Sequence, residues 1–160
     1  MKTYLPASAQ KATVADLLDA LIVDYRARAR KSLPQILSHA KRIREHFGHL
    51  KASDVTGRLV DSYIAERKAA GDPNATINRG TQLLSQAYRR EIKQDQPRVI
   101  GLPTIQRLPE QNARQGFFEP ADVTAVCAGL PAVLADFFRF EYLTAWRPGD
   151  LRALRWEHIE

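Results

Sequence analysis

The sequence predicts an all-α fold, and three observations lead to this prediction. Apolar residues recur at three- and four-residue steps in successive segments, which is typical of helices with one buried face. Glycine or proline stands near the ends of several of these segments, where it stops a helix. Hydrophobic residues make up 44% and charged residues 26% of the 160 residues, a globular composition. The length allows one domain, or one small domain and part of another.

Four helices are expected in the first part of the chain, and they cover residues 13–29, 34–47, 57–70 and 76–93. Thr13 and Thr76 are the expected N-caps of the first and the fourth, with Asp16 at a capping-box-like spacing from Thr13. Gly48 and Gly71 can close the second and the third. The expected inner face of the third helix consists of Leu59, Val60, Tyr63 and Ile64. Short connections predict a compact bundle.

The pattern changes after this bundle. Three of the nine prolines fall between residues 94 and 116, where no periodicity is sustained, which predicts an extended linker. Three further helices are expected at about 120–128, 133–144 and 148–154. The chain is therefore expected to consist of an N-terminal arm, a bundle, a linker and a second helical segment, over residues 1–12, 13–93, 94–118 and 119–160.

The basic residues are concentrated before the linker. Residues 1–93 carry 17 Lys and Arg against 9 Asp and Glu, a net charge of +8. Residues 94–160 carry 7 against 9, a net charge of −2, so the two parts sum to the +6 of the whole chain. This asymmetry favours a polyanion-binding module joined to a second part. A helical domain with a merely basic surface is the alternative.

Composition also excludes several classes of site. The single cysteine, Cys127, excludes an intrachain disulfide framework and a cysteine-based zinc cluster. Of His39, His46 and His49, the last two are three residues apart, but Gly48 intervenes at an expected helix end and no third metal ligand is obvious. We expect no metal site and no cofactor. No apolar run has the roughly 18 residues of a membrane span, and no secretory signal is visible, so a cytoplasmic location without membrane contact is expected. Cys127, Trp146 and Trp156 are interpreted as packing residues.

Seven polar side chains on the second and fourth helices are candidates for contact with double-stranded DNA: Lys41, Arg42, Arg44, Asn78, Arg79, Gln82 and Arg89. Lysine and arginine neutralise phosphates and make affinity depend on salt. Asn78 and Gln82 carry the donor and acceptor needed to recognise an adenine edge, although phosphate contact or simple solvation fits them equally well.

One segment carries a recognisable motif, Thr144-Ala145-Trp146-Arg147-Pro148-Gly149-Asp150-Leu151, followed by Leu154-Arg155-Trp156. Pro148 suits the first position of a helix, so Arg147 stands at its start, where a planar guanidinium can bind two phosphate oxygens. Asp150 is close enough in sequence to support that side chain. The segment resembles the first active-site motif of the tyrosine recombinases, or phage integrases, Thr-Gly-x-Arg-x-x-Glu-Leu followed by Leu-x-Trp.

Other segments share this resemblance. Asn78-Arg79 is similar to the start of the family's last core-binding helix, and residues 112–118 to the opening of its catalytic domain. The resemblance implies a SAM-like four-helix core-binding bundle, a linker and the first helices of a truncated catalytic domain. It implies that Arg147 is the first catalytic arginine, which holds the scissile phosphate, and that Asp150 is the supporting acid. Ala145 departs from the family's glycine, and Asp150 from its glutamate.

The family's other catalytic residues, among them the tyrosine nucleophile, follow this motif, and the sequence stops at Glu160. We therefore expect the chain to bind DNA without recombining it, as part of a site-specific recombinase for DNA integration. The resemblance also implies that recombinase protomers meet on paired sites. Two alternatives remain open at this point: a stand-alone DNA-binding protein that competes with an intact integrase, and a basic helical protein-interaction module.

Overall fold

The structure is a computed structural model that describes residues 11–111 and 116–158. The described residues contain helices and no strand, so the all-α prediction is confirmed for them. The chain divides into two compact units, Met1–Gln111 and Asn112–Glu160. Ten residues of the expected N-terminal arm, 1–10, lie outside the described residues, as do 112–115, the start of the segment that resembles a catalytic-domain opening. No helix of the described residues is long and apolar enough to cross a membrane.

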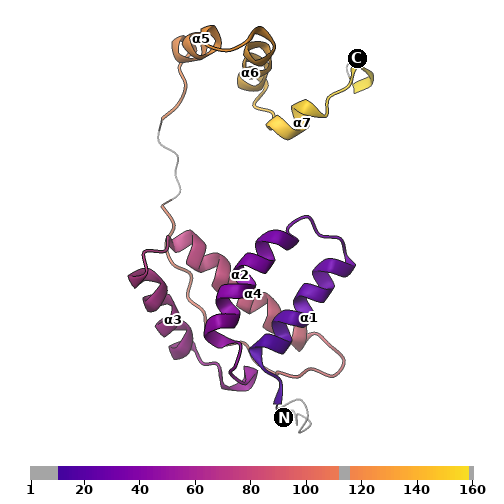
Figure 1. Cartoon of the computed structure of the whole chain (residues 1–160), viewed down its shortest axis with the longest axis vertical. Helices are drawn as coiled ribbons and strands as arrows, with labels where there is room; N and C mark the ends of the chain where they lie inside the picture. The colour runs from indigo at the N-terminus through magenta and orange to yellow at the C-terminus, as the bar shows by residue number, and fades with distance from the viewer. Residues whose placement is uncertain (1–10, 112–115, 159–160) are drawn as a thin grey trace. The chain divides into compact units, whose positions relative to one another are not determined.

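The first unit contains the predicted four-helix bundle (Figure 1). Its helices are α1 (Val14–Ala27), α2 (Leu33–Phe47), α3 (Gly57–Ala69) and α4 (Asn74–Ile92), with a short 3-10 turn, η2 (Ala52–Asp54), before α3. Helices α1, α2 and α4 pack on one another, and α3 packs on α4. The core between them is made of large side chains that are fully buried, among them Leu17, Leu18, Ile43, Phe47, Val60, Ile77, Leu84 and Tyr88.

The helix ends confirm some of the expected caps and correct others. The capping box of α1 is present: the Asp16 amide donates to Thr13 Oγ1 (3.2 Å), and the Thr13 amide donates to Asp16 Oδ2 (2.8 Å). The prediction that Thr76 caps α4 is wrong. Pro73 is the N-cap, and its carbonyl accepts the amides of Thr76 (2.9 Å) and Ile77 (3.1 Å), because proline's fixed φ suits a helix start.

Two further details of the bundle differ from expectation. Gly48 ends α2 in the right-handed region (φ −56°), so it does not act through a left-handed conformation; a Cβ there would lie 2.4 Å from the Arg44 carbonyl oxygen. Leu59 was expected on the inner face of α3, but it remains 36% exposed. Val60, Tyr63 and Ile64 are buried as predicted. The buried face of α3 therefore contains three of the four apolar residues that were predicted for it.

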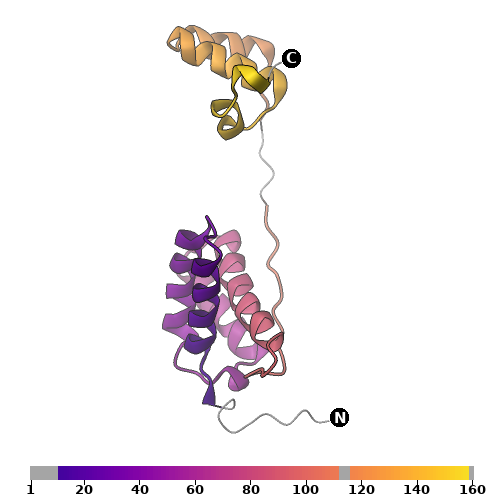
Figure 2. The same ribbon diagram turned by 90° about the vertical axis from the view of Figure 1, so that its right-hand side faces the viewer.

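Residues 94–111, here called the strap, belong to the first unit although they were expected to be linker. They have no helix, and Figure 2 shows them as an extended segment alongside the bundle. Val99 belongs to the core and is 3% exposed, and Ile105 and Leu108 pack against the same core. The first unit thus ends at Gln111 and not at Lys93. An extended segment that is anchored by isolated side chains has no helical period, so the sequence pattern does not reveal its packing.

The second unit contains three helices, α5 (Pro120–Ala128), α6 (Ala132–Thr144) and α7 (Pro148–Arg152), and the turn η3 (Trp156–His158). Helices α5 and α6 pack together around Val123, Cys127 and Ala135. Cys127 is a packing residue as interpreted, whereas Trp156 is 89% exposed and Trp146 is exposed as well. The core of this unit is too small to bury these indole rings, and many apolar side chains of α6 are exposed as well.

Candidate nucleic-acid interface

One face of α4 carries a continuous row of long polar side chains. Arg79, Gln82, Gln86 and Arg89 follow one another at steps of three, four and three residues, which places them on one side of a helix. Ile77, Leu84 and Tyr88 lie in the core. We call these four polar residues the α4 ridge. Sequence reasoning found three of them and missed Gln86, although Gln86 continues the same helical spacing.

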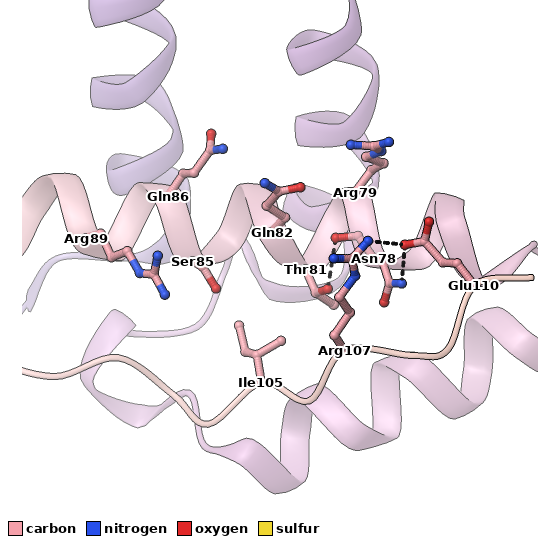
Figure 3. A pocket seen from close by; sticks show the side chains of 10 residues that line it. All are labelled: Asn78, Arg79, Thr81, Gln82, Ser85, Gln86, Arg89, Ile105, Arg107 and Glu110. Atoms are coloured by element: carbon pink, nitrogen blue, oxygen red, sulfur yellow. Dashed lines mark hydrogen bonds and ion pairs between the residues drawn. The ribbon is translucent and has the colours of Figure 1, made fainter. Parts of the chain in front are cut away.

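A groove runs between α4 and the strap, with a volume of about 410 Å³. Figure 3 shows its wall: Arg89 and Ser85 reach from α4 toward the strap, and Arg107 reaches from the strap toward α4. We call it the strap groove. Its remaining lining residues are Asn78, Arg79, Thr81, Gln82, Gln86, Ile105 and Glu110. Arg107 belongs to the expected linker and could not be placed from the sequence.

The strap groove carries an excess of positive charge. Among the described residues, Arg79 and Arg89 form no ion pair. Arg107 pairs with Glu110 (Nη2–Oε1 3.0 Å), and its side chain remains 78% exposed. The lining of this groove therefore contains three guanidinium groups and one carboxylate. Such a balance attracts the phosphates of a polyanion.

Asn78 does not occupy the position that a base-reading residue needs. The residue is 7% exposed, and its amide is bonded to the strap. Its Nδ2 donates to the Leu108 carbonyl oxygen (2.9 Å) and to Glu110 Oε1 (2.6 Å), and its Oδ1 accepts from the Leu108 amide (2.9 Å). The expectation that Asn78 faces solvent is wrong, because the strap satisfies its hydrogen-bonding groups within the unit.

A second groove flanks the α4 ridge on the side of α2, with a volume of about 360 Å³. Gln35 and His39 of α2 line it together with Arg79, Gln82 and Gln86. Burial lowers the pKa of His39 below its usual value, and the nearby positive charges of Arg42 and Arg79 lower it further. Both effects favour the neutral form of His39, whereas a bound phosphate would favour its charged form.

The three basic candidates of α2 do not join the α4 ridge as one cluster. Lys41 and Arg44 line a separate groove between α1 and α2. Arg44 forms an ion pair with Asp19, with Nη1 donating to Oδ2 at 3.2 Å. Arg42 lies near Asp72 (Nη1–Oδ2 3.9 Å). The expected single basic surface is thus divided over several faces, and two of its arginines already have a carboxylate partner.

The motif residues of the second unit lie at the start of α7. Arg147 is exposed as the N-cap, and its carbonyl accepts the amides of Asp150 (2.9 Å) and Leu151 (3.1 Å). Within the described residues, no side-chain hydrogen bond or ion pair joins Arg147 to Asp150. Ala145, where the resembling family has glycine, ends α6 in the left-handed region (φ 54°, ψ 24°). This is a conformation that glycine adopts more readily than alanine.

The described residues contain no group of three or more His, Cys, Asp or Glu side chains that could hold a metal ion. No protein-family model, curated protein or solved structure matches the chain. The functional argument therefore starts from the residues of the α4 ridge and from the motif around Arg147.

Proposed function

We propose that this chain is the DNA-binding part of a site-specific tyrosine recombinase that acts in DNA integration and recombination. It binds double-stranded DNA through the α4 ridge and the grooves that flank it. The observation that carries this proposal is the row of Arg79, Gln82, Gln86 and Arg89 on one face of α4, with no ion pair to another described residue at either arginine. The bundle takes the role of the SAM-like core-binding domain.

The dimensions of the α4 ridge suit a duplex. Arg79 and Arg89 are ten residues apart, which corresponds to about 15 Å of helix at 1.5 Å per residue. The major groove of B-DNA is about 12 Å wide and admits a helix. Two arginines at the ends of such a ridge can contact phosphates, while the amides of Gln82 and Gln86 between them can donate to and accept from base edges.

The second unit supplies the link to recombination. Arg147 stands exposed at the start of α7, in a segment that resembles the first active-site motif of tyrosine recombinases. In the parent reaction it holds the scissile phosphate, and Asp150 supports it. The chemistry of that family needs no metal and no cofactor, because a tyrosine forms the covalent intermediate. Its protomers assemble on paired sites, so other recombinase protomers are the proposed protein partners.

Two variants with equal loss of charge test the DNA interface in the full chain. R79A/R89A removes both arginines of the α4 ridge, and K41A/R44A removes two charges from the groove between α1 and α2. Duplex affinity is measured at several salt concentrations. We expect R79A/R89A to weaken binding by about 10- to 100-fold and to reduce the salt slope by about 2, because each phosphate contact contributes roughly 0.9 to that slope.

K41A/R44A should have a smaller effect, since Arg44 already has Asp19 as its partner. If both double variants weaken binding equally, the chain binds DNA by its overall charge and the α4 ridge has no special role. If the full chain shows no salt-dependent affinity for duplex DNA, the proposed function is wrong, and the protein-interaction module becomes the better interpretation.

A further inference from the structure

We propose that the strap forms part of the DNA-binding surface, and that Asn78 is the positioning residue that holds its Arg107 beside the α4 ridge, where Arg107 binds a phosphate of the duplex backbone. The inference rests on the proposed function of the α4 ridge. It adds a second wall to the interface, one that comes from residues 105–110 and not from a helix.

The first step is the bonding of Asn78. A buried side-chain amide costs free energy unless its donors and acceptor are paired. All three hydrogen bonds of this amide go to Leu108 and Glu110, which lie 30 and 32 residues further along the chain. Asn78 thus uses both of its N–H donors and its carbonyl oxygen within the unit to hold one short stretch of the strap against α4.

The second step leads from Asn78 to Arg107. A single carboxylate oxygen, Oε1 of Glu110, accepts from Asn78 Nδ2 (2.6 Å) and from Arg107 Nη2 (3.0 Å) (Figure 3). On either side of Arg107 along the chain, Ile105 and Leu108 pack against the core. The backbone of Arg107 is therefore anchored at both sides, and its guanidinium is oriented by a carboxylate that Asn78 holds in place.

The third step is the chemistry of the strap groove. Arg107 and Arg89 reach into the groove, whereas Arg79 contributes to its lining with a side chain that points away from the strap (Figure 3). Glu110 supplies the one carboxylate of the lining. Guanidinium groups bind phosphate oxygens through paired N–H donors. The Ser85 hydroxyl adds a neutral donor on the side of the strap, and the Gln82 and Gln86 amides add donors on the side of α4 that points away from it (Figure 3). A strand of duplex backbone, with regularly spaced phosphates, fits this arrangement of separated cations and neutral donors.

The test uses the full chain and a double-mutant cycle of Asn78→Ala and Arg107→Ala. We expect R107A to weaken duplex binding about 10-fold and to reduce the salt slope by about 1, as for one lost phosphate contact. N78A should have a similar effect, and N78A/R107A should bind no more weakly than R107A. Hydrogen exchange at the Leu108 amide, which donates to Asn78 Oδ1, should accelerate in N78A and remain slow in R107A.

Two matched controls accompany the cycle. N74A removes another asparagine of α4 that bonds the strap, at the Pro109 carbonyl oxygen (2.8 Å), but leaves the Asn78–Glu110–Arg107 contacts intact. R58A removes one exposed arginine from α3 that lines neither of the grooves beside the α4 ridge. Both controls should bind DNA within about twofold of the unchanged chain, since neither removes a contact of Arg107.

The results separate this inference from the proposed function. If R107A binds as tightly as the unchanged chain while R79A/R89A does not, the strap is not part of the interface and the inference alone fails. The same conclusion holds if the effects of N78A and R107A simply add. Because Arg107 is exposed, R107A decides the question even if N78A does not fold. Displacement of duplex DNA from the chain by poly-L-glutamate at an equal charge concentration would indicate an acidic protein partner. This result would also overturn the inference.

Discussion

At two alanines the backbone takes a left-handed conformation that side chains with a Cβ seldom adopt. Ala29 has φ 48°, just after α1, and Ala145 has φ 54°, just after α6. After α1 the Arg30 amide donates to the Tyr25 carbonyl oxygen (3.1 Å), which is the long closing bond of a glycine-type helix C-cap. Both alanines thus occupy positions where a glycine would relieve backbone strain.

Replacement of Ala29 by glycine should stabilise the bundle. The left-handed conformation costs an L-residue about 1–2 kcal/mol, and glycine's extra unfolded-state entropy offsets about 0.5–1 kcal/mol of this, so A29G should raise the free energy of unfolding by up to about 1.5 kcal/mol. Urea unfolding followed by far-UV circular dichroism measures the change. The control A20G, within α1, should lower stability by about 1 kcal/mol. Destabilisation by A29G would show that this residue is not left-handed in solution.

Whether a single residue is buried or exposed could be predicted where helical spacing determines the face of the helix on which it lies. Arg79, Gln82 and Arg89 were placed on the outer face of the fourth helix by their steps of three and seven residues, and the structure leaves all three exposed. Asn78 is next to them in sequence and equally polar, yet it is buried. Its partner Leu108 lies 30 residues away in a segment without periodicity, so no local pattern could reveal the contact.

At the scale of elements, the strap is the part that sequence reasoning could not place. The sequence predicted all seven α-helices to within a few residues, because the four helices of the bundle each bury one apolar face and proline marks the start of α5 and of α7. The strap is instead held by a few separate contacts, among them the ion pair between Arg98 and Glu91 of α4, whose carboxylate is buried. Arg98 donates to both carboxylate oxygens of Glu91, each at 2.7 Å.

Arg98→Ala should strongly destabilise the first unit at neutral pH. The Glu91 side chain is 4% exposed, and loss of its partner would leave a buried carboxylate unpaired, at a cost of about 3 kcal/mol. Hydrogen bonding to Arg98 holds the pKa of Glu91 below its ordinary value of 4.5. The ion pair therefore stabilises the folded chain above pH 4.5, and this stabilisation is lost as the pH falls through the lowered pKa of Glu91.

It follows that the difference in unfolding free energy between the unchanged chain and R98A should be largest near pH 7 and should shrink as the pH falls below 4.5, the ordinary pKa of a glutamate. Urea unfolding at several pH values measures this difference. E91M/R98A is the control: it removes both charges, and it should be more stable than R98A at pH 7 because no carboxylate is left unpaired. A difference that stays constant with pH would mean that the pair does not form.

At the scale of the whole molecule, the two units differ in how completely they bury their apolar residues. The first unit has an extended core that includes Leu17, Phe47 and Tyr88, whereas the buried hydrophobic residues among the described part of the second are Val123, Cys127 and Ala135. In the second unit Phe117 is 91% and Leu143 is 80% exposed. Charge and proline placement predicted a division into two parts, but they placed it after the fourth helix, since only packing reveals that the strap belongs to the bundle.

This boundary can be tested by truncation. A fragment of residues 1–111 retains the strap, and we expect it to unfold cooperatively in urea. A fragment of residues 1–93 loses Arg98, Val99 and Leu108, so Glu91 would be unpaired and apolar core surface would be exposed. Burial of one valine alone contributes about 1.5 kcal/mol or more, so the shorter fragment should be less stable by at least about 3 kcal/mol.

Residues 112–160 alone should unfold without a sharp transition and should associate at high concentration, because so much of their apolar surface is exposed. Equal stability of the fragments 1–93 and 1–111 would contradict the assignment of the strap to the first unit. In that case the linker would begin directly after α4, and Asn78 would need another partner for its buried amide. The truncation therefore also tests the contact that the DNA-binding role of Arg107 requires, by a measurement that involves no DNA.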